Sequence, residues 1–110
     1  MIDPGVFHDA PIARLFSEGD TVHIEVEEFA LSSVEMCPPS RISIRHCREV
    51  LRDGVPVPAM TAESEDGEIY GIDWDAGGIT LSVIWSRYEP HAEWSVTYRL
   101  VRARLDIAPL

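Results

Sequence analysis

Two aspartates, Asp73 and Asp75, are the first candidates for chemistry in this chain. They stand two residues apart in an alternating segment, so both carboxylates are expected on one face of a strand. Paired carboxylates can bind a divalent cation or share a proton. A histidine such as His8 or His91, brought in by the fold, would complete a metal site. Aspartate also favours turn geometry beside Gly77-Gly78, so the pair suits a purely structural role as well.

Cysteine and histidine provide a second set of reactive groups. Cys37, His46 and Cys47 are zinc-type ligands, and a cysteine and a histidine can also form a nucleophilic pair assembled by the fold. Their spacing matches no C-x-x-C or H-x-x-x-H pattern, and reduced thiols explain the two cysteines equally well. The sequence contains no G-x-S-x-G, Walker-type or G-x-G-x-x-G motif. We therefore expect a protein that is not an enzyme, with no catalytic residue and no cofactor.

Charge gives the strongest indication of a partner. The 110 residues include 19 acidic against 9 basic side chains, a formal net charge of −10. Such a chain repels phosphate backbones and anionic lipid, which argues against nucleic acid and membranes as partners, and it attracts a basic protein. The charge equally suits a role in solubility alone. The candidate partner-binding residues are the acidic side chains Glu25, Glu27, Glu63, Glu65, Asp66 and Glu68.

Alternating apolar residues define the elements that must position these groups. In residues 21–27, Val22, Ile24 and Val26 fall on one face of a strand, with polar residues on the other. The alternation returns at 41–46, 68–74, 79–86 and 94–101, with turn-forming residues between the runs. Short turns between consecutive strands produce antiparallel pairs. The sequence predicts one all-β domain over 1–110, mainly antiparallel, with about seven strands in a β-sandwich or an open, barrel-like roll.

Some segments carry narrower predictions. Tyr70, Ile72 and Trp74 are expected on one buried face of their strand. Residues 46–53 have the spacing of one short helix, but they also suit a strand, a bend and a loop. Residues 103–110 are expected to form a loosely held tail. Residues 1–5 lack the features of a secretory signal, and no apolar run approaches the ~18 residues of a membrane span, so we expect a cytoplasmic location.

A resemblance adds to this interpretation. The opening Phe7-His8-Asp9-Ala10, followed by the hydrophobic-acidic strand at 21–27, resembles a group of small uncharacterised bacterial β-proteins. Glu49-Val50-Leu51 and Gly67-Glu68-Ile69 are approximate counterparts of two further segments of that group. Some of its members are similar to immunity proteins of bacterial toxin systems. The resemblance implies a compact β-fold and a dedicated protein partner, and it implies no catalytic residue.

Three functional hypotheses follow from the sequence. The first is a non-enzymatic interaction domain that covers a basic surface on another protein, as an immunity-type inhibitor does. The second is a small metal- or ligand-binding β-domain that uses Asp73 and Asp75 with a histidine. The third is a self-associating structural module or homodimer, because the edge strands of an antiparallel sheet have unpaired N–H and C=O groups that can pair with another chain. Pro56 and Pro58 would hinder pairing at one such edge, because proline has no N–H to donate to a neighbouring strand.

Overall fold

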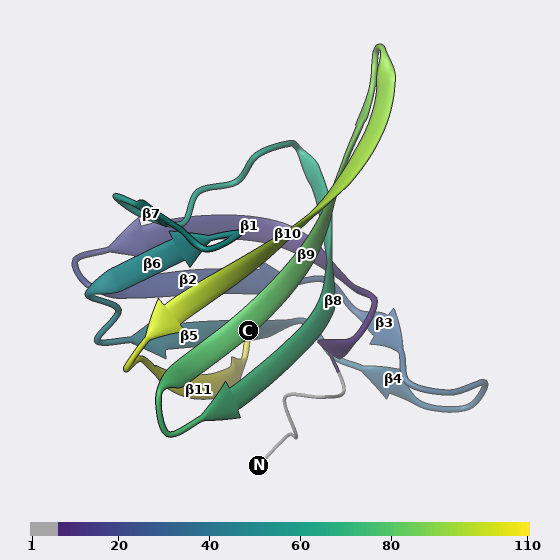
Figure 1. Ribbon diagram of the computed structural model, residues 1–110. Helices are drawn as coiled ribbons and strands as arrows, with labels where there is room; N and C mark the ends of the chain where they lie inside the picture. The colour runs from purple at the N-terminus through teal and green to yellow at the C-terminus, as the bar shows by residue number, and fades with distance from the viewer. Residues whose placement is uncertain (1–6) are drawn as a thin grey trace.

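Eleven strands and no helix form the secondary structure of residues 7–110, the part of the chain that the computed structural model describes (Figure 1). The all-β, antiparallel fold predicted from the alternation is therefore confirmed; the predicted lack of a signal over 1–5 lies outside the described residues. The strands are β1 (Ala10–Glu18), β2 (Thr21–Val26), β3 (Phe29–Ala30), β4 (Met36–Cys37), β5 (Ser40–Arg45), β6 (Glu49–Arg52), β7 (Val55–Val57), β8 (Asp66–Asp75), β9 (Gly78–Tyr88), β10 (His91–Val101) and β11 (Arg104–Pro109).

One open sheet provides both layers of the domain. Its strand order is β11-β5-β2-β1-β8-β9-β10-β6-β7, and a separate hairpin pairs β3 with β4. The fold turns at β1: only Ala10 and Pro11 pair with β8, whereas the strand pairs with β2 from Ile12 to Glu18. The sheet therefore bends there into two facing layers, one of β1, β2, β5 and β11 and the other of β6 to β10 (Figure 1). Two hairpins project from this body: β9–β10 at the top and β3–β4 at the right.

The apolar core lies between the two layers. Val22, Ile24 and Val26 are buried, as the alternation predicted. Ile42 and Ile44 lie beside them on β5, and the opposite layer contributes the inward face of β9, from Ile79 to Trp85. Met60, in the segment between β7 and β8, is 1% exposed and packs into the same core. Burying apolar side chains between two sheet faces is the main stabilising term in such a fold.

A β-bulge corrects one prediction about β8. Ile69 and Ile72 are both buried, although they are three residues apart, because the register shifts between Ile69 and Gly71. Tyr70 is the extra residue, and its side chain is 54% exposed instead of buried. Trp74, at the end of the strand, is 56% exposed. The prediction of one buried face was wrong for Tyr70, which points to the other side; Trp74 pairs with the buried Ile79 and shares the side of Ile72, but it is exposed.

Residues 103–110 and residues 46–53 both contribute a strand to the sheet. Residues 103–110 were expected to be loosely held, but β11 pairs with β5 along its whole length. Leu105 lies opposite Ile44 and Ile107 opposite Ile42, so two apolar side chains attach the strand to the core. For 46–53, the interpretation as a strand with a bend is confirmed, since β6 pairs with β10 and buries Val50. The free edges of the sheet are β11 and β7; self-association through them stays a prediction.

Candidate functional site

The outward side of β8, β9 and β10 is the candidate site. Alternate residues of β9, from Ile79 to Trp85, are buried, so the residues between them and their cross-strand partners point away from the core. We call this surface the acidic face. Its members are Asp66, Glu68, Tyr70, Asp73 and Asp75 of β8; Thr80, Ser82, Ile84, Ser86 and Tyr88 of β9; and His91, Glu93, Ser95, Thr97 and Arg99 of β10.

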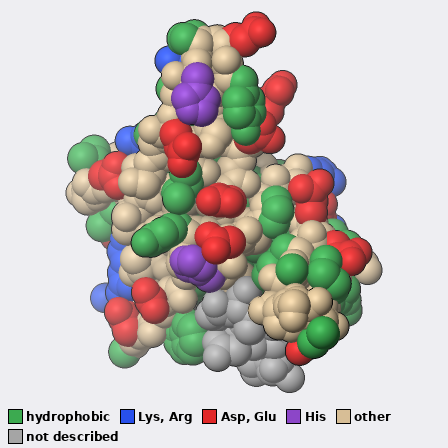
Figure 2. Space-filling view, turned by 90° about the vertical axis from the view of Figure 1, so that its right-hand side faces the viewer, with side chains coloured by type: hydrophobic (Ala, Val, Ile, Leu, Met, Phe, Trp, Pro, Cys, Tyr) green, Lys and Arg blue, Asp and Glu red, His purple; other side chains and the backbone are tan. Residues whose placement is uncertain are grey.

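Carboxylates outnumber cations on the acidic face. Arg99 is the one arginine among its members, and it donates to Asp75 Oδ1 at 2.7 Å and to Thr80 Oγ1 at 2.9 Å. The guanidinium of Arg99, together with the N–H of Gly77, holds the pKa of Asp75 below its usual range. The remaining carboxylates of the face are exposed or half-buried. Figure 2 shows acidic and hydrophobic side chains interspersed below the projecting hairpin, with basic side chains at the margins.

The opposite layer has a different charge. Its outward side chains include Arg14 of β1, Arg41 and Arg45 of β5, and Arg104 of β11. Glu25 lies between two of these arginines and is only 8% exposed. Its Oε2 accepts from Arg41 Nε at 3.0 Å and Nη2 at 2.5 Å, and its Oε1 lies 3.7 Å from Arg14 Nη1. On the acidic face, by contrast, Asp66, Glu68, Asp73 and Glu93 form no salt bridge with any described residue.

A shallow hollow opens in the middle of the acidic face. It has a volume of about 380 Å³. Small side chains account for it, since Ser82 has Gly71 as its partner on β8 and Thr97 as its partner on β10. The ring of His8 packs against Tyr70 with 5.3 Å between the ring centroids. The side chains that line the hollow are Tyr70, Ser82, Ile84, Ser95 and Thr97.

The six predicted partner-binding residues do not form one surface. Asp66 and Glu68 lie on the acidic face, and Glu65 is exposed immediately before β8. Glu27 is exposed just after β2, on the other layer. Glu25 is neutralised there by the two arginines, and Glu63 is turned toward the interior. Adjacency in the sequence grouped acids that the fold separates, and it missed Asp73 and Glu93 as members of the same surface.

Glu63 is the centre of a partly buried polar network. Its Oε1 accepts from Arg52 Nη2 at 2.7 Å and from Trp94 Nε1 at 3.1 Å. Its Oε2 accepts from Arg52 Nε at 2.8 Å and from the Tyr98 hydroxyl at 2.5 Å. The same hydroxyl accepts a hydrogen bond from Trp85 Nε1 at 3.1 Å. Each carboxylate oxygen therefore has two donors, as a partly buried charge requires.

The network shifts three ionisation equilibria. Arg52, Tyr98 and Trp94 donate to Glu63 and lower its pKa to about 2, although burial opposes them. The hydrogen bond to Glu63 raises the pKa of Arg52. Burial, with the negative charge of Glu63 added, raises the pKa of Tyr98. These shifts all favour the ion pair and the neutral phenol, so no group of the network is poised to exchange a proton near neutral pH. The hydrogen bonds of the network connect β6, β9 and β10 with the loop that carries Glu63.

Asp73, Asp75 and His91 of the predicted metal site belong to the acidic face and His8 packs against Tyr70 beside it, but the four residues do not converge. His91 packs against Tyr88 at the tip of the β9–β10 hairpin, with 6.0 Å between the ring centroids. Asp75 lies opposite Gly78 at the other end of β9, which corresponds to roughly 33 Å of strand. His8 contacts Asp9 and Tyr70. Among the described residues, no group of three or more His, Cys, Asp or Glu side chains is placed to hold a metal ion.

The cysteines have the properties of inert thiols. Cys37 is buried in β4, and Cys47 is partly buried after β5; both are free thiols. Burial, together with the charge of Asp20, raises the pKa of Cys47. His46 Nδ1 lies 3.9 Å from Asp20 Oδ2. A raised thiol pKa is the opposite of what a nucleophilic cysteine needs.

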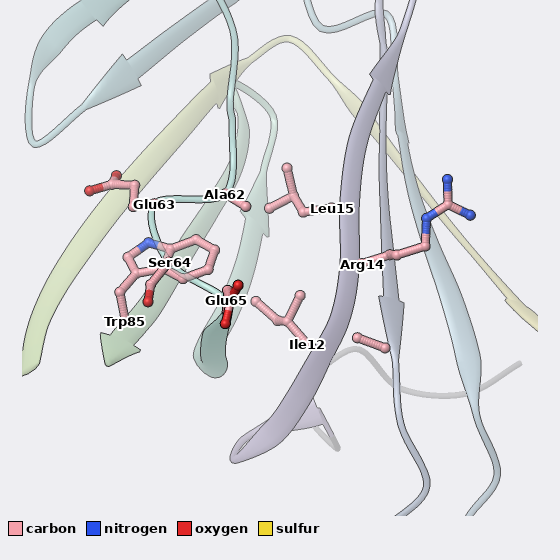
Figure 3. A pocket seen from close by; sticks show the side chains of 9 residues that line it. Ile12, Arg14, Leu15, Ala62, Glu63, Ser64, Glu65 and Trp85 are labelled. Atoms are coloured by element: carbon pink, nitrogen blue, oxygen red, sulfur yellow. The ribbon is translucent and has the colours of Figure 1, made fainter. Parts of the chain in front are cut away.

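A second concavity lies where β1 leaves β8. This groove has a volume of about 540 Å³, between β1 and residues 62–65, with Trp85 in its lining. Ile12 and Leu15 point from β1 toward Trp85 and Ala62, whereas Arg14 and Glu63 point away from the groove (Figure 3). Its walls continue the core between the layers and present one exposed carboxylate, that of Glu65. The groove brings no reactive groups together, and we assign it a packing role.

Comparisons with protein-family models, curated proteins and solved structures gave no significant match. The fold and its surface define the class: an all-β domain of two layers that presents one acidic sheet face. The resemblance to small bacterial β-proteins and the cytoplasmic location stay predictions. Within residues 7–110, no helix has the length and hydrophobicity needed to cross a membrane.

Proposed function

We propose that this protein is a non-enzymatic interaction domain whose acidic face covers a basic surface on another protein, as an immunity-type inhibitor does. The observation that carries the proposal is the segregation of charge between the two layers. Arginines surround Glu25 on one layer, whereas the carboxylates of the other layer face solvent beside serine and threonine. An exposed carboxylate array next to exposed aromatic rings is suited to a basic partner.

The β8–β9–β10 sheet also supplies the apolar side of such an interface. Tyr70 and Tyr88 are more than half exposed on the acidic face, at 54% and 64%. Tyrosine is enriched among the residues that dominate binding energies, because a rigid ring buries much area at little entropic cost. Carboxylates around these rings would steer a basic partner into place and raise the association rate, an effect that falls as salt increases.

A charge-matched pair of variants tests the proposal. The first variant neutralises the acidic face with D66N, E68Q, D73N and E93Q. The control makes E27Q, E28Q, E35Q and D106N, which remove the same charge from exposed positions elsewhere. Each protein is used to capture partners from the source cells; the recovered partner is then purified and its association rate is measured at low and at high salt.

The proposal predicts that the face variant associates at least about ten-fold more slowly than wild type at low salt, with a smaller loss in the control. High salt should remove most of this difference. Equal losses in the two variants would show that net charge alone matters, and would contradict the proposal. So would a purified partner whose binding neither variant changes.

A further inference from the structure

We infer that the hollow in the acidic face is a pocket for an arginine side chain of the basic partner. The inference rests on the proposed function and goes further, because it names the group that anchors the partner and the residues that receive it. The pocket is the hollow of about 380 Å³ between the Tyr70 ring and the hydroxyls of Ser82, Ser95 and Thr97, with Ile84 beside them.

Gly71 is a glycine that the described part of the domain does not require. A Cβ added at Gly71 would meet no atom of residues 7–110 within 4 Å, so packing against them does not demand glycine there. Its φ lies outside the left-handed region that Gly19, Gly54 and Gly78 occupy, so the bulge beside it does not demand glycine either. Glycine inside a strand weakens the strand, and it often marks a place where another molecule approaches closely.

The location of Gly71 shows where that approach would occur. Gly71 is the β8 partner of Ser82, whose side chain lines the hollow. A side chain at position 71 would therefore project outward beside Ser82 and fill the hollow. Because Gly71 has no side chain, the hollow stays open for a ligand. The glycine weakens the strand, and no contact within the described domain compensates for that.

The lining has the chemistry of a guanidinium site. Tyr70 presents an aromatic ring, on which the planar guanidinium of arginine can stack. Ile84 offers apolar area for the aliphatic stem of the arginine. The hydroxyls of Ser82 and Thr97, 3.5 Å apart, together with Ser95, provide acceptors for several N–H groups.

Carboxylates next to the hollow complete the match. Glu68 is the cross-strand partner of Ile84, and Asp73 follows Gly71 on the same outward side of β8. The one arginine of the face, Arg99, is held by Asp75 and Thr80 outside the lining. The charge of the rim thus favours a cation supplied by another molecule, and the flat ring with several acceptors favours arginine over lysine.

Titration of the full chain with three small probes tests the pocket. The probes are N-acetyl-arginine methylamide, the lysine analogue, and the citrulline analogue, which has nearly the same shape without the charge. Amide ¹⁵N–¹H spectra should show saturable shifts at Gly71, Ser82 and Thr97 with the arginine probe. Lysine should bind roughly three-fold more weakly or worse, and citrulline should not saturate at the same concentrations.

Two variants make the test specific. G71L fills the hollow where a Cβ meets no atom, so it should keep the wild-type melting temperature and lose the saturable shifts. S86L adds the same bulk on the same outward face of β9, outside the lining, and should keep them. Binding by G71L as tight as wild type, or shifts that spread without saturation and do not distinguish the three probes, would overturn the pocket.

Measurements of partner binding distinguish failure of the pocket from failure of the proposed function. If the face-neutralised variant loses the purified partner while G71L binds it like wild type, the pocket is wrong and the proposed function stands. If the arginine probe saturates the hollow but neutralising the face leaves partner binding unchanged, the proposed function is wrong. Loss of partner binding in both G71L and the face variant, together with loss of the saturable probe shifts in G71L, supports both.

Discussion

Replacing Glu63 with glutamine should destabilise the domain much more than the same change at Glu65. Both oxygens of Glu63 accept two hydrogen bonds, from Arg52, Trp94 and Tyr98. Glutamine keeps one oxygen and presents an NH₂ group to donors where the other oxygen was. Glu65 is exposed two residues later and serves as the matched control, because E65Q removes the same charge from the same segment.

The magnitude follows from which partners stay buried. A hydrogen bond to a charged group contributes about 1.5–3 kcal/mol net. The contributions from one carboxylate are not additive, and the Arg52 side chain, 39% exposed, can turn to water after the change. The Tyr98 hydroxyl cannot, since that residue is 2% exposed. We therefore expect E63Q to lower the free energy of unfolding by about 2–4 kcal/mol, with E65Q within about 0.5 kcal/mol of wild type.

The pH dependence gives a second, independent signature. The folded pKa of Glu63, about 2, lies below its ordinary value of 4.5, so its stabilising effect is complete above pH 4.5 and is lost as pH falls toward 2. Urea unfolding of both variants and wild type at pH 7 and at pH 3 measures it. The deficit of E63Q should shrink at pH 3. A deficit equal to that of E65Q at pH 7, or one that is the same at both pH values, would refute the network as described.

Two further changes test the packing of the sheet. G67A should lower the free energy of unfolding by about 1–3 kcal/mol, because the new Cβ would lie 2.6 Å from two ring carbons of the buried Trp85. G71A, whose Cβ meets no described atom within 4 Å, should not lower it. The urea midpoints of the two variants test the difference. E25Q removes the carboxylate that accepts two hydrogen bonds from Arg41 and should lower stability by about 1–3 kcal/mol, an effect that thermal unfolding of E25Q beside the exposed-site variant E27Q would reveal.

Period-two alternation predicts much of this fold, because the two faces of a half-buried strand differ in polarity at every second residue. The spacing of Val22, Ile24 and Val26 alone places their side chains inward, and all three are buried. The bulge at Tyr70 could not be predicted. One extra residue changes which face of the sheet the following residues point to, and the residue types around it do not reveal the insertion. The pairing of β11 was missed for a different reason: the alternation around Asp106 covers only Leu105 and Ile107 and is too short to stand out.

The candidate site was less predictable because it depends on which strands are neighbours. Asp66 and Glu93 are far apart in the sequence, yet each pairs with Ser86, so they flank one residue of β9. Glu63 looked as available for a partner as Glu65, and only the fold brings Arg52 and Tyr98 to it. Sequence supplies the number of carboxylates; long-range pairing decides which of them remain free.

Cross-strand neighbours also explain why the carboxylates on the two layers differ in their pairing. Glu25 lies opposite Arg41 on β5, so that strand pair neutralises its own charge. On the other layer the neighbours of the acids are uncharged: Asp66 pairs with Ser86, Glu68 with Ile84 and Asp73 with Thr80. These partners can neither neutralise a carboxylate nor cover it. The charges of these acids therefore add up on one sheet face without internal compensation, and a basic partner would be attracted to that face.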